Sequence, residues 1–174
     1  MDLLLDTADL AEVEHALQYY PIKGITTNPT MLSRLEQTHV LSHLKAIRAL
    51  IGDERDLHVQ LMARDRETMI REAHHLATQL GEQTFIAVPV TEVGLSVIKQ
   101  LAQEGLNITA STVFSTIQGI LAMLSGARYV AVFYDRMLNL DIDAGRVIKE
   151  LAGLLWTNTS STQVLAASFR NVAE

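Results

Sequence analysis

Short apolar runs alternate with longer amphipathic segments along nearly the whole chain, and this alternation constrains the fold more than any other feature of the sequence. The apolar runs are predicted to be strands at residues 3–6, 24–28, 57–62, 85–90, 107–113, 129–134 and 164–169. The segments between them are predicted to be helices at about residues 7–16, 29–50, 66–80, 93–103, 114–124 and 143–156. Such a chain is expected to form a parallel sheet covered by helices.

Two architectures fit this alternation, an open doubly wound sheet and a (β/α)8 barrel. The turn after the first predicted strand is Asp6-Thr7-Ala8-Asp9, which lacks the glycine-rich phosphate loop of a dinucleotide-binding sheet. We therefore predict an α/β fold of the TIM (β/α)8 barrel type, as a single domain over residues 1–174. A closed barrel needs eight strands and about 200 to 250 residues, so about seven β/α units are expected here, with the C-terminal end missing.

The composition disfavours several classes of protein. The formal net charge of −6 argues against nucleic acid or an anionic membrane surface as a partner. The absence of cysteine excludes disulfides and thiolate chemistry, and it suits a reducing compartment. The first residues lack the basic region and long apolar run of a signal peptide, and no stretch reaches the roughly 18 apolar residues of a membrane span. We therefore expect a cytoplasmic protein.

Polar side chains recur near the carboxyl ends of several predicted strands. Alternate residues of a strand share a face. One choice of face groups Asp6, Thr26, Asn28, Gln60, Ser111 and Ser168. Barrel enzymes place their active sites at this end of the strands, and buried polar groups are costly without partners. The group is therefore predicted to form a shared site, although each residue could instead cap a helix or form a local hydrogen bond.

Several runs of residues resemble one family in order and spacing. They are residues 4–7, 24–30, 88–91 followed by Gly94-Leu95, 118–119, 126–131 and 164–169. The Thr26-Thr27-Asn28-Pro29-Thr30 turn resembles the most diagnostic motif of the transaldolases. The resemblance covers essentially the whole chain and is closest to the short subgroup that contains fructose-6-phosphate aldolase and the small transaldolases. It implies a class I aldolase or transaldolase that acts on ketose phosphates such as fructose 6-phosphate.

The resemblance also implies a role for each site residue. Asp6 is the general acid/base, Gln60 and Ser111 bind the catalytic water, and Ala87 occupies the position of the Schiff-base lysine. The implied substrate-binding residues are Thr26, Asn28, Phe133, Arg136 and Ser168, of which the last two bind the phosphate. The resemblance further implies a ketose or aldose phosphate as substrate, no cofactor, no metal, and a homo-oligomer that is a pentamer or decamer.

Alanine at residue 87 departs from the family pattern. In the family reaction a lysine amine attacks the ketose carbonyl and forms an iminium, which accepts the electron pair when the carbon–carbon bond breaks. A methyl group cannot form an imine, so the chain as written is predicted to lack Schiff-base activity. The four lysines, Lys23, Lys45, Lys99 and Lys149, are predicted at a strand entry or within helices.

Several alternatives stay open. Ala87 can be an engineered substitution, the mark of a natural lysine-free relative, or part of a degenerate copy. The alternative function is a non-catalytic sugar-phosphate-binding protein on the same scaffold. A metal-dependent enzyme is disfavoured, because only His39 and His43 have helical i, i+4 spacing and no third ligand is evident. Phe133 favours the transaldolases, whereas the short segments favour fructose-6-phosphate aldolase.

Overall fold

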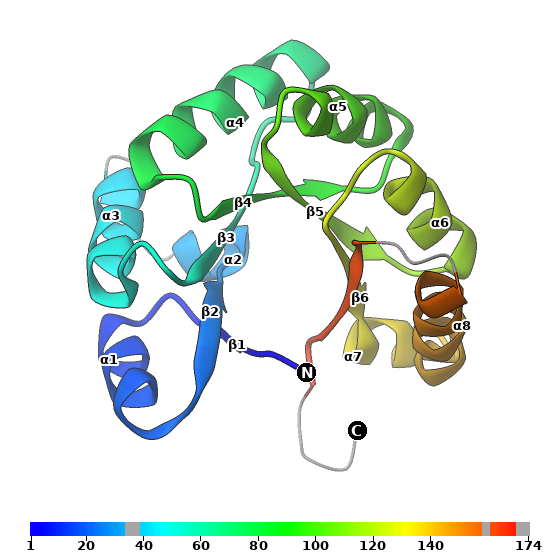
Figure 1. Ribbon diagram of the computed structural model, residues 1–174, viewed down its shortest axis with the longest axis horizontal. Coiled ribbons are helices and arrows are strands. Elements are labelled where there is room, and N and C mark those ends of the chain that lie inside the picture. The colour runs from blue at the N-terminus through cyan, green and yellow to red at the C-terminus, as the bar shows by residue number, and fades with distance from the viewer. Residues whose placement is uncertain (34–38, 158–160, 170–174) are drawn as a thin grey trace. The chain divides into compact units, whose positions relative to one another are not determined.

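The computed structural model describes residues 1–33, 39–157 and 161–169. The chain divides into two compact units, Met1–Ile86 and Ala87–Glu174, and each is described by itself. In both units strands alternate with helices, and the helices cover one face of the strands (Figure 1). The single domain predicted over residues 1–174 stays a prediction.

The first unit begins the sheet. Its strands are β1 (Leu3–Asp6), β2 (Ile22–Thr26), β3 (Asp56–Gln60) and the start of β4 (Thr84–Pro89). Its helices are α1 (Leu10–Tyr19), α2 (Pro29–Leu32), α3 (Val40–Ile51) and α4 (Arg66–Leu80). β2 pairs in parallel with both β1 and β3, so the carboxyl ends of these strands lie at one edge.

The second unit contains the end of β4 and the rest of the chain. Its further strands are β5 (Asn107–Val113), β6 (Tyr129–Phe133) and β7 (Gln163–Ala167). Its helices are α5 (Glu92–Gln103), α6 (Thr116–Leu124), α7 (Tyr134–Leu138) and α8 (Ala144–Thr157). β6 pairs in parallel with both β5 and β7.

The strand order is β1-β2-β3-β4-β5-β6-β7, so each strand from β2 onward is bonded to the strand that precedes it in the chain. In an open doubly wound sheet the strand order reverses at a switch point, and no reversal occurs here. Consecutive parallel strands with helices between them are the pattern of the TIM barrel. The predicted α/β fold class is therefore confirmed, with a seven-stranded sheet in the part of the chain that the structure describes.

Apolar side chains between strands and helices form the core of each unit. Fully buried examples in the first unit are Val13, Ile25, Ile47, Ile51 and Leu57. Fully buried examples in the second unit are Val97, Ile98, Leu101, Ile108 and Val132. These residues come from the predicted apolar runs and from the apolar faces of the helices, so burial of apolar surface stabilises the predicted elements.

Three element boundaries differ from the prediction for local reasons. β2 ends at Thr26 because Asn28, which the strand was expected to include, caps α2. In the described part of the predicted helix over residues 29–50, α2 ends at Leu32 and α3 begins at Val40, and Leu35 from the predicted periodicity lies outside the described residues. β6 ends at Phe133 because Tyr134 begins α7, a helix of 5 residues that is too short to show a periodicity in the sequence.

Arg48 on α3 is buried and donates to three backbone carbonyl groups from two segments of the first unit. Its Nη1 donates to the carbonyl oxygens of Gly52 and Arg55 at 2.9 and 2.7 Å. Its Nη2 donates to the carbonyl oxygen of Gln83 at 2.9 Å, just before β4. One guanidinium therefore fixes both the α3–β3 loop and the entry of β4.

We expect Arg48→Met to lower the free energy of unfolding by about 2–4 kcal/mol, because three carbonyl groups lose a charged donor. Urea denaturation measures this change. Arg71→Met on α4 is the matched control: Arg71 is exposed and donates to the Thr68 hydroxyl at 3.0 Å. The control should change stability by no more than about 0.5 kcal/mol. Equal effects of the two substitutions would show that the buried hydrogen bonds of Arg48 contribute little.

Candidate active site

The carboxyl ends of β1 and β2 bring two predicted site residues into contact. Asp6 and Thr26 are the last residues of their strands and lie opposite each other in the parallel register. Thr26 Oγ1 donates to Asp6 Oδ1 at 2.7 Å. Asp6 is exposed, so its carboxyl group is oriented by the threonine and still accessible to a ligand. A carboxyl group in this setting can transfer protons.

Asn28 follows β2 and begins α2. Its Oδ1 accepts from the backbone N–H of Met31 at 3.0 Å, so the helix-capping interpretation is confirmed for this residue. The NH2 group of its side chain takes no part in that bond and can donate to another molecule. The hydroxyl of Thr27 donates to the carbonyl oxygen of His58 at 3.1 Å, which joins the same turn to β3.

Gln60 is the last residue of β3 and is half-buried. Alternation places it on the same face of the strand as His58, whose ring stacks on that of Phe85 with 4.7 Å between centroids. The loop after Gln60 is bonded to α4, because Glu72 Oε1 accepts from the backbone N–H of Met62 at 3.0 Å. Neighbouring elements therefore fix both the strand and the loop at Gln60.

In the second unit, Ala87 and Ser111 are buried on neighbouring strands. Ala87 lies in β4 and is 6% exposed. The backbone N–H of Val90 donates to the carbonyl oxygen of Ser111 at 3.0 Å, which joins the end of β4 to β5. Among the described residues, none forms a hydrogen bond with Ser111 Oγ. Because a buried hydroxyl without a partner is costly, Ser111 Oγ is suited to bind a water molecule or a ligand.

The β5 strand is irregular directly after Ser111. Thr112 has φ 55°, in the left-handed region that β-branched residues rarely adopt. The register with β6 shifts between Ala110 and Val113. Bulges beside active sites often change the direction of a side chain, and strained residues gather at functional sites. This irregularity therefore favours a functional role for the stretch around Ser111.

Phe133 and Arg136 lie together at the end of β6. Phe133 is the last residue of that strand, and Arg136 lies on α7, which follows directly. The guanidinium carbon of Arg136 lies 4.9 Å from the centroid of the Phe133 ring, a cation–π contact. Arg136 is exposed, and within the described residues its guanidinium has no hydrogen-bond or ion-pair partner. Its N–H groups are therefore available to an anion.

Ser168 directly follows β7. The register of β6 and β7 places Phe133 opposite Ala167, so Ser168 lies one residue beyond that pair. Ser168 has φ 66°, a left-handed conformation that is uncommon outside glycine. Phe133, Arg136 and Ser168 therefore lie at the same ends of two paired strands.

Phe114 contacts Phe133, and Gln118 binds the backbone of Phe114; the sequence prediction assigns neither residue a role. The Phe114 ring lies edge-on to Phe133, with 6.5 Å between centroids and 80° between planes. Gln118 Oε1 accepts from the backbone N–H of Phe114 at 2.9 Å. The signal in the sequence is the Ser115-x-x-Gln118 spacing at the start of α6, which is typical of a capping box.

None of the four lysines lies at the carboxyl end of a strand. Lys23 is the second residue of β2 and forms an ion pair with Asp56 at 3.7 Å. The other three lie on helices, Lys45 on α3, Lys99 on α5 and Lys149 on α8. All four side chains are exposed, and the predicted placement at a strand entry or on helices is confirmed.

No group of three or more His, Cys, Asp or Glu side chains that could hold a metal ion occurs in the described ranges of the chain. Of the helical pair predicted from spacing, His39 occupies the N-cap position of α3 without a side-chain capping hydrogen bond, and a ring nitrogen of His43 lies 2.6 Å from the carbonyl oxygen of Ala8. Within residues 1–33, 39–157 and 161–169, no helix is both long enough and apolar enough to cross a membrane.

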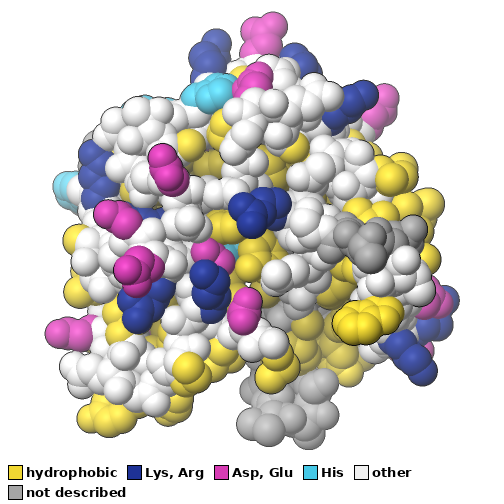
Figure 2. All heavy atoms as spheres, viewed as in Figure 1, with side chains coloured by type: hydrophobic (Ala, Val, Ile, Leu, Met, Phe, Trp, Pro, Cys, Tyr) yellow, Lys and Arg dark blue, Asp and Glu magenta, His cyan; other side chains and the backbone are white. Residues whose placement is uncertain are grey.

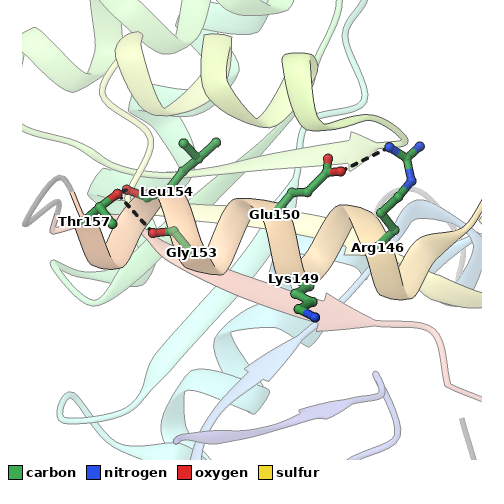
Figure 3. A pocket seen from close by; sticks show the side chains of 6 residues that line it. All are labelled: Arg146, Lys149, Glu150, Gly153, Leu154 and Thr157. Carbon is green, nitrogen blue, oxygen red and sulfur yellow. Dashed lines mark hydrogen bonds and ion pairs between the residues drawn. The ribbon is translucent and has the colours of Figure 1, made fainter.

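A hollow on the second unit lies along α8 (Figure 3). It is lined by Arg146, Lys149, Glu150, Gly153, Leu154 and Thr157. Arg146 Nη1 lies 3.1 Å from Glu150 Oε1 in an exposed ion pair. Because the lining comes from one helix and includes no predicted site residue, the hollow lacks the convergent polar groups of a binding site.

Comparison with known proteins decides the family. The model of the transaldolase/fructose-6-phosphate aldolase family matches residues 3–174. The chain belongs to this family. It is 41% identical over 174 residues to a probable fructose-6-phosphate aldolase of Streptococcus pneumoniae (strain ATCC 700669 / Spain 23F-1). That alignment covers 100% of this chain and 78% of the relative, so the resemblance inferred from the motifs is confirmed.

Solved structures share the fold at low sequence identity. A racemase from Streptomyces coelicolor A3(2) with bound magnesium has a TM-score of 0.64 at 14% identity over 97% of this chain. The muconate lactonizing enzyme from Pseudomonas putida has a TM-score of 0.63 at 16% identity over 94% of this chain. The chain spans about half of those proteins, 47% and 45% of their lengths. At these identities the likeness concerns the fold alone.

His58 shares a strand face with Gln60, and the burial of its side chain can be tested through the pH dependence of stability. The side chain is 2% exposed, and burial lowers the pKa of His58 to about 3. In the unfolded chain its pKa is about 6.5. Between these values the unfolded chain binds a proton that the folded chain does not, so stability falls as the pH decreases below about 6.5.

We expect the wild-type chain to lose about 2 kcal/mol more unfolding free energy between pH 7 and pH 5 than His58→Leu does. Urea denaturation at the two pH values measures the difference. His74→Leu removes an exposed histidine of α4 and should keep the wild-type pH dependence. The same pH dependence in wild type and His58→Leu would mean that the folded chain protonates His58 readily.

Proposed function

We propose that this chain binds a ketose phosphate such as fructose 6-phosphate in the manner of class I aldolases and transaldolases, with the covalent step removed by Ala87. Arg136 carries the proposal, because its guanidinium stacks on Phe133 and has no hydrogen-bond or ion-pair partner in the described residues. A planar guanidinium with free N–H groups binds two phosphate oxygens at once. The hydroxyl of Ser168, at the same ends of β6 and β7, is the proposed second phosphate ligand.

The proposed proton-transfer and hydroxyl-binding groups come from the ends of the other strands. Asp6 is the general acid/base, and its hydrogen bond from Thr26 supports this role by orienting the carboxyl group. The side-chain NH2 of Asn28 binds substrate hydroxyls. Gln60 and Ser111 bind the catalytic water, and the buried Ser111 Oγ, without a hydrogen bond within the described residues, supports that assignment.

Ala87 occupies the proposed position of the Schiff-base lysine. Along β4 it comes two residues after Phe85, so alternation places both side chains on one face of the strand. A lysine there would attack the substrate carbonyl, expel water and form an iminium. The carbon–carbon bond would then break, with its electron pair moving into the iminium. The alanine methyl has no lone pair, so this chain can bind the substrate but cannot activate it.

A non-catalytic sugar-phosphate-binding protein is the second candidate, and Ala87 is the observation that favours it. Both candidates use the same phosphate and hydroxyl ligands. They differ in whether a lysine placed at residue 87 is enough to produce aldol chemistry. The choice between transaldolase and fructose-6-phosphate aldolase specificity, and a cytoplasmic location, belong to the same proposal.

The homo-oligomer, which the family resemblance implies as a pentamer or decamer, is also part of the proposal. Ile117, Leu121 and Leu124 on α6 are exposed, as is Trp156 on α8. Figure 2 shows hydrophobic side chains gathered over the part of the second unit that contains these helices. Exposed apolar patches often mark protein–protein interfaces, which supports self-association.

We expect Ala87→Lys to form a covalent adduct with fructose 6-phosphate or its three-carbon fragment, because the new amine can form an imine. Sodium borohydride reduces an imine to a stable secondary amine. Mass spectrometry of the intact protein then detects the adduct, and peptide mapping assigns it to residue 87. The unmodified chain should show no adduct under the same conditions.

The matched control is Ala87→Met, which adds a side chain of similar length without an amine. It should bind fructose 6-phosphate no better than Ala87→Lys and should form no adduct. If Ala87→Lys folds and binds the ligand but forms no adduct, the non-catalytic candidate is preferred. An adduct on the unmodified chain would show that the chain has another reactive amine and that its predicted lack of Schiff-base activity is wrong.

We expect Arg136→Gln to weaken fructose 6-phosphate binding by about tenfold to a hundredfold, because a charged bidentate hydrogen bond to the phosphate is lost. Isothermal titration calorimetry measures the dissociation constant. Arg146→Gln is the control: Arg146 is an exposed arginine of α8 that pairs with Glu150, and its loss should leave binding unchanged. If millimolar ligand neither binds to nor stabilises the wild-type chain, the proposed phosphate site is wrong.

A further inference from the structure

Arg136 is an exposed side chain on a helix of 5 residues, so α7 alone does little to fix its guanidinium. A free arginine side chain loses considerable conformational entropy when a ligand orders it. Within the described residues the guanidinium makes one ring contact, with Phe133 at 4.9 Å, and no hydrogen bond or ion pair. Within the described residues, the Phe133 ring is therefore the contact that restrains the guanidinium of Arg136.

The Phe133 ring is fixed in turn by Phe114. The two rings form an edge-to-face pair, with 6.5 Å between centroids and 80° between planes. Aromatic rings favour this arrangement because the positive edge of one ring meets the negative face of the other. Phe114 directly follows β5, and Phe133 ends β6, which pairs with β5. The loop after β5 therefore supports the residue at the end of β6.

Gln118 fixes the backbone of Phe114 through an altered helix cap. In a capping box, the side chain three residues into the helix accepts from the backbone N–H of the N-cap residue. The N-cap of α6 is Ser115, and its Oγ accepts from the backbone N–H of Gln118 at 3.3 Å. Gln118 Oε1 instead accepts from Phe114, one residue before the N-cap, at 2.9 Å. The glutamine therefore stabilises the position of Phe114 as well as the helix start.

We propose that Gln118 and Phe114 are positioning residues for a phosphate-binding guanidinium, acting in the order Gln118, Phe114, Phe133, Arg136. The ligand class is a phosphate monoester or inorganic phosphate. The inference rests on the proposed function, because Arg136 is assigned to phosphate there. Neither Gln118 nor Phe114 needs to touch the ligand, since each acts through the next residue in the series.

The test uses the full chain and two pairs of substitutions. In the first pair, Gln118→Leu removes the hydrogen-bond acceptor, whereas Gln118→Glu keeps an acceptor. In the second pair, Phe114→Leu removes the aromatic ring, whereas Phe114→Tyr keeps the ring. Calorimetry gives the dissociation constants for fructose 6-phosphate and for inorganic phosphate. We expect both leucine variants to bind both ligands about threefold to tenfold more weakly, because the ring and cation contacts are lost. The Glu and Tyr variants should bind like wild type.

A second readout separates positioning from a general loss of stability. We expect the ring current of Phe133 to shift the NMR resonance of the Arg136 Nε–H group, because the guanidinium lies over the ring. The loss of this resonance in Arg136→Lys assigns it. Both leucine variants should move this resonance in the ligand-free protein. Asp65→Ala removes the N-cap of α4, where Asp65 Oδ1 accepts from the backbone N–H of Thr68 at 2.9 Å, and lowers the stability of the chain. This control should leave the resonance and both dissociation constants unchanged.

The outcomes are distinct. If both leucine variants leave the resonance and affinities unchanged while Arg136→Gln weakens binding, the positioning role is wrong and the proposed phosphate site stands. If Asp65→Ala has the same effects as the leucine variants, the effect is a general loss of stability and the positioning role is wrong. If the wild-type chain binds neither ligand, the phosphate site itself is wrong and the inference fails with it.

Discussion

Parallel hydrogen bonding between consecutive strands is the constraint on which the arrangement of the candidate site depends. In a parallel pair the carboxyl ends of both strands lie at one edge, so residues far apart in the chain become neighbours there. This pairing places Asp6 opposite Thr26 in the first unit and Phe133 opposite Ala167, just before Ser168, in the second. Backbone pairing therefore sets which residues are neighbours at the strand ends, and their side chains supply the proposed chemistry.

Residues at the starts of helices have a second role near these strand ends, in addition to capping the helix. Asn28 caps α2 with its carbonyl oxygen and keeps its NH2 group for another partner. Ser115 and Gln118 begin α6, and Gln118 also binds the backbone of Phe114. Because a helix follows each of these strand ends, a residue that stabilises the helix also fixes the loop beside the site. Helix capping and a functional role are therefore compatible in one residue.

Under the proposed function, Ala87 separates binding from covalent chemistry. Family membership over residues 3–174 supports the proposal that the scaffold holds a ketose phosphate. The side chains proposed to bind phosphate and to transfer protons are not removed by an alanine at residue 87. Binding can therefore persist while imine formation cannot, since only an amine supplies the lone pair that attacks the carbonyl.

The sequence by itself determined the alternation of strands and helices, the family, and the placement of Asp6, Thr26, Gln60 and Ser168 near the carboxyl ends of strands. These features depend on local patterns of apolar residues and on short motifs, which a single chain displays directly. The tertiary structure alone decided the contact between Arg136 and Phe133, the support from Phe114 and Gln118, and the short helix α7. Those features depend on distances between side chains of different strands and loops, and no periodicity in the sequence records such distances.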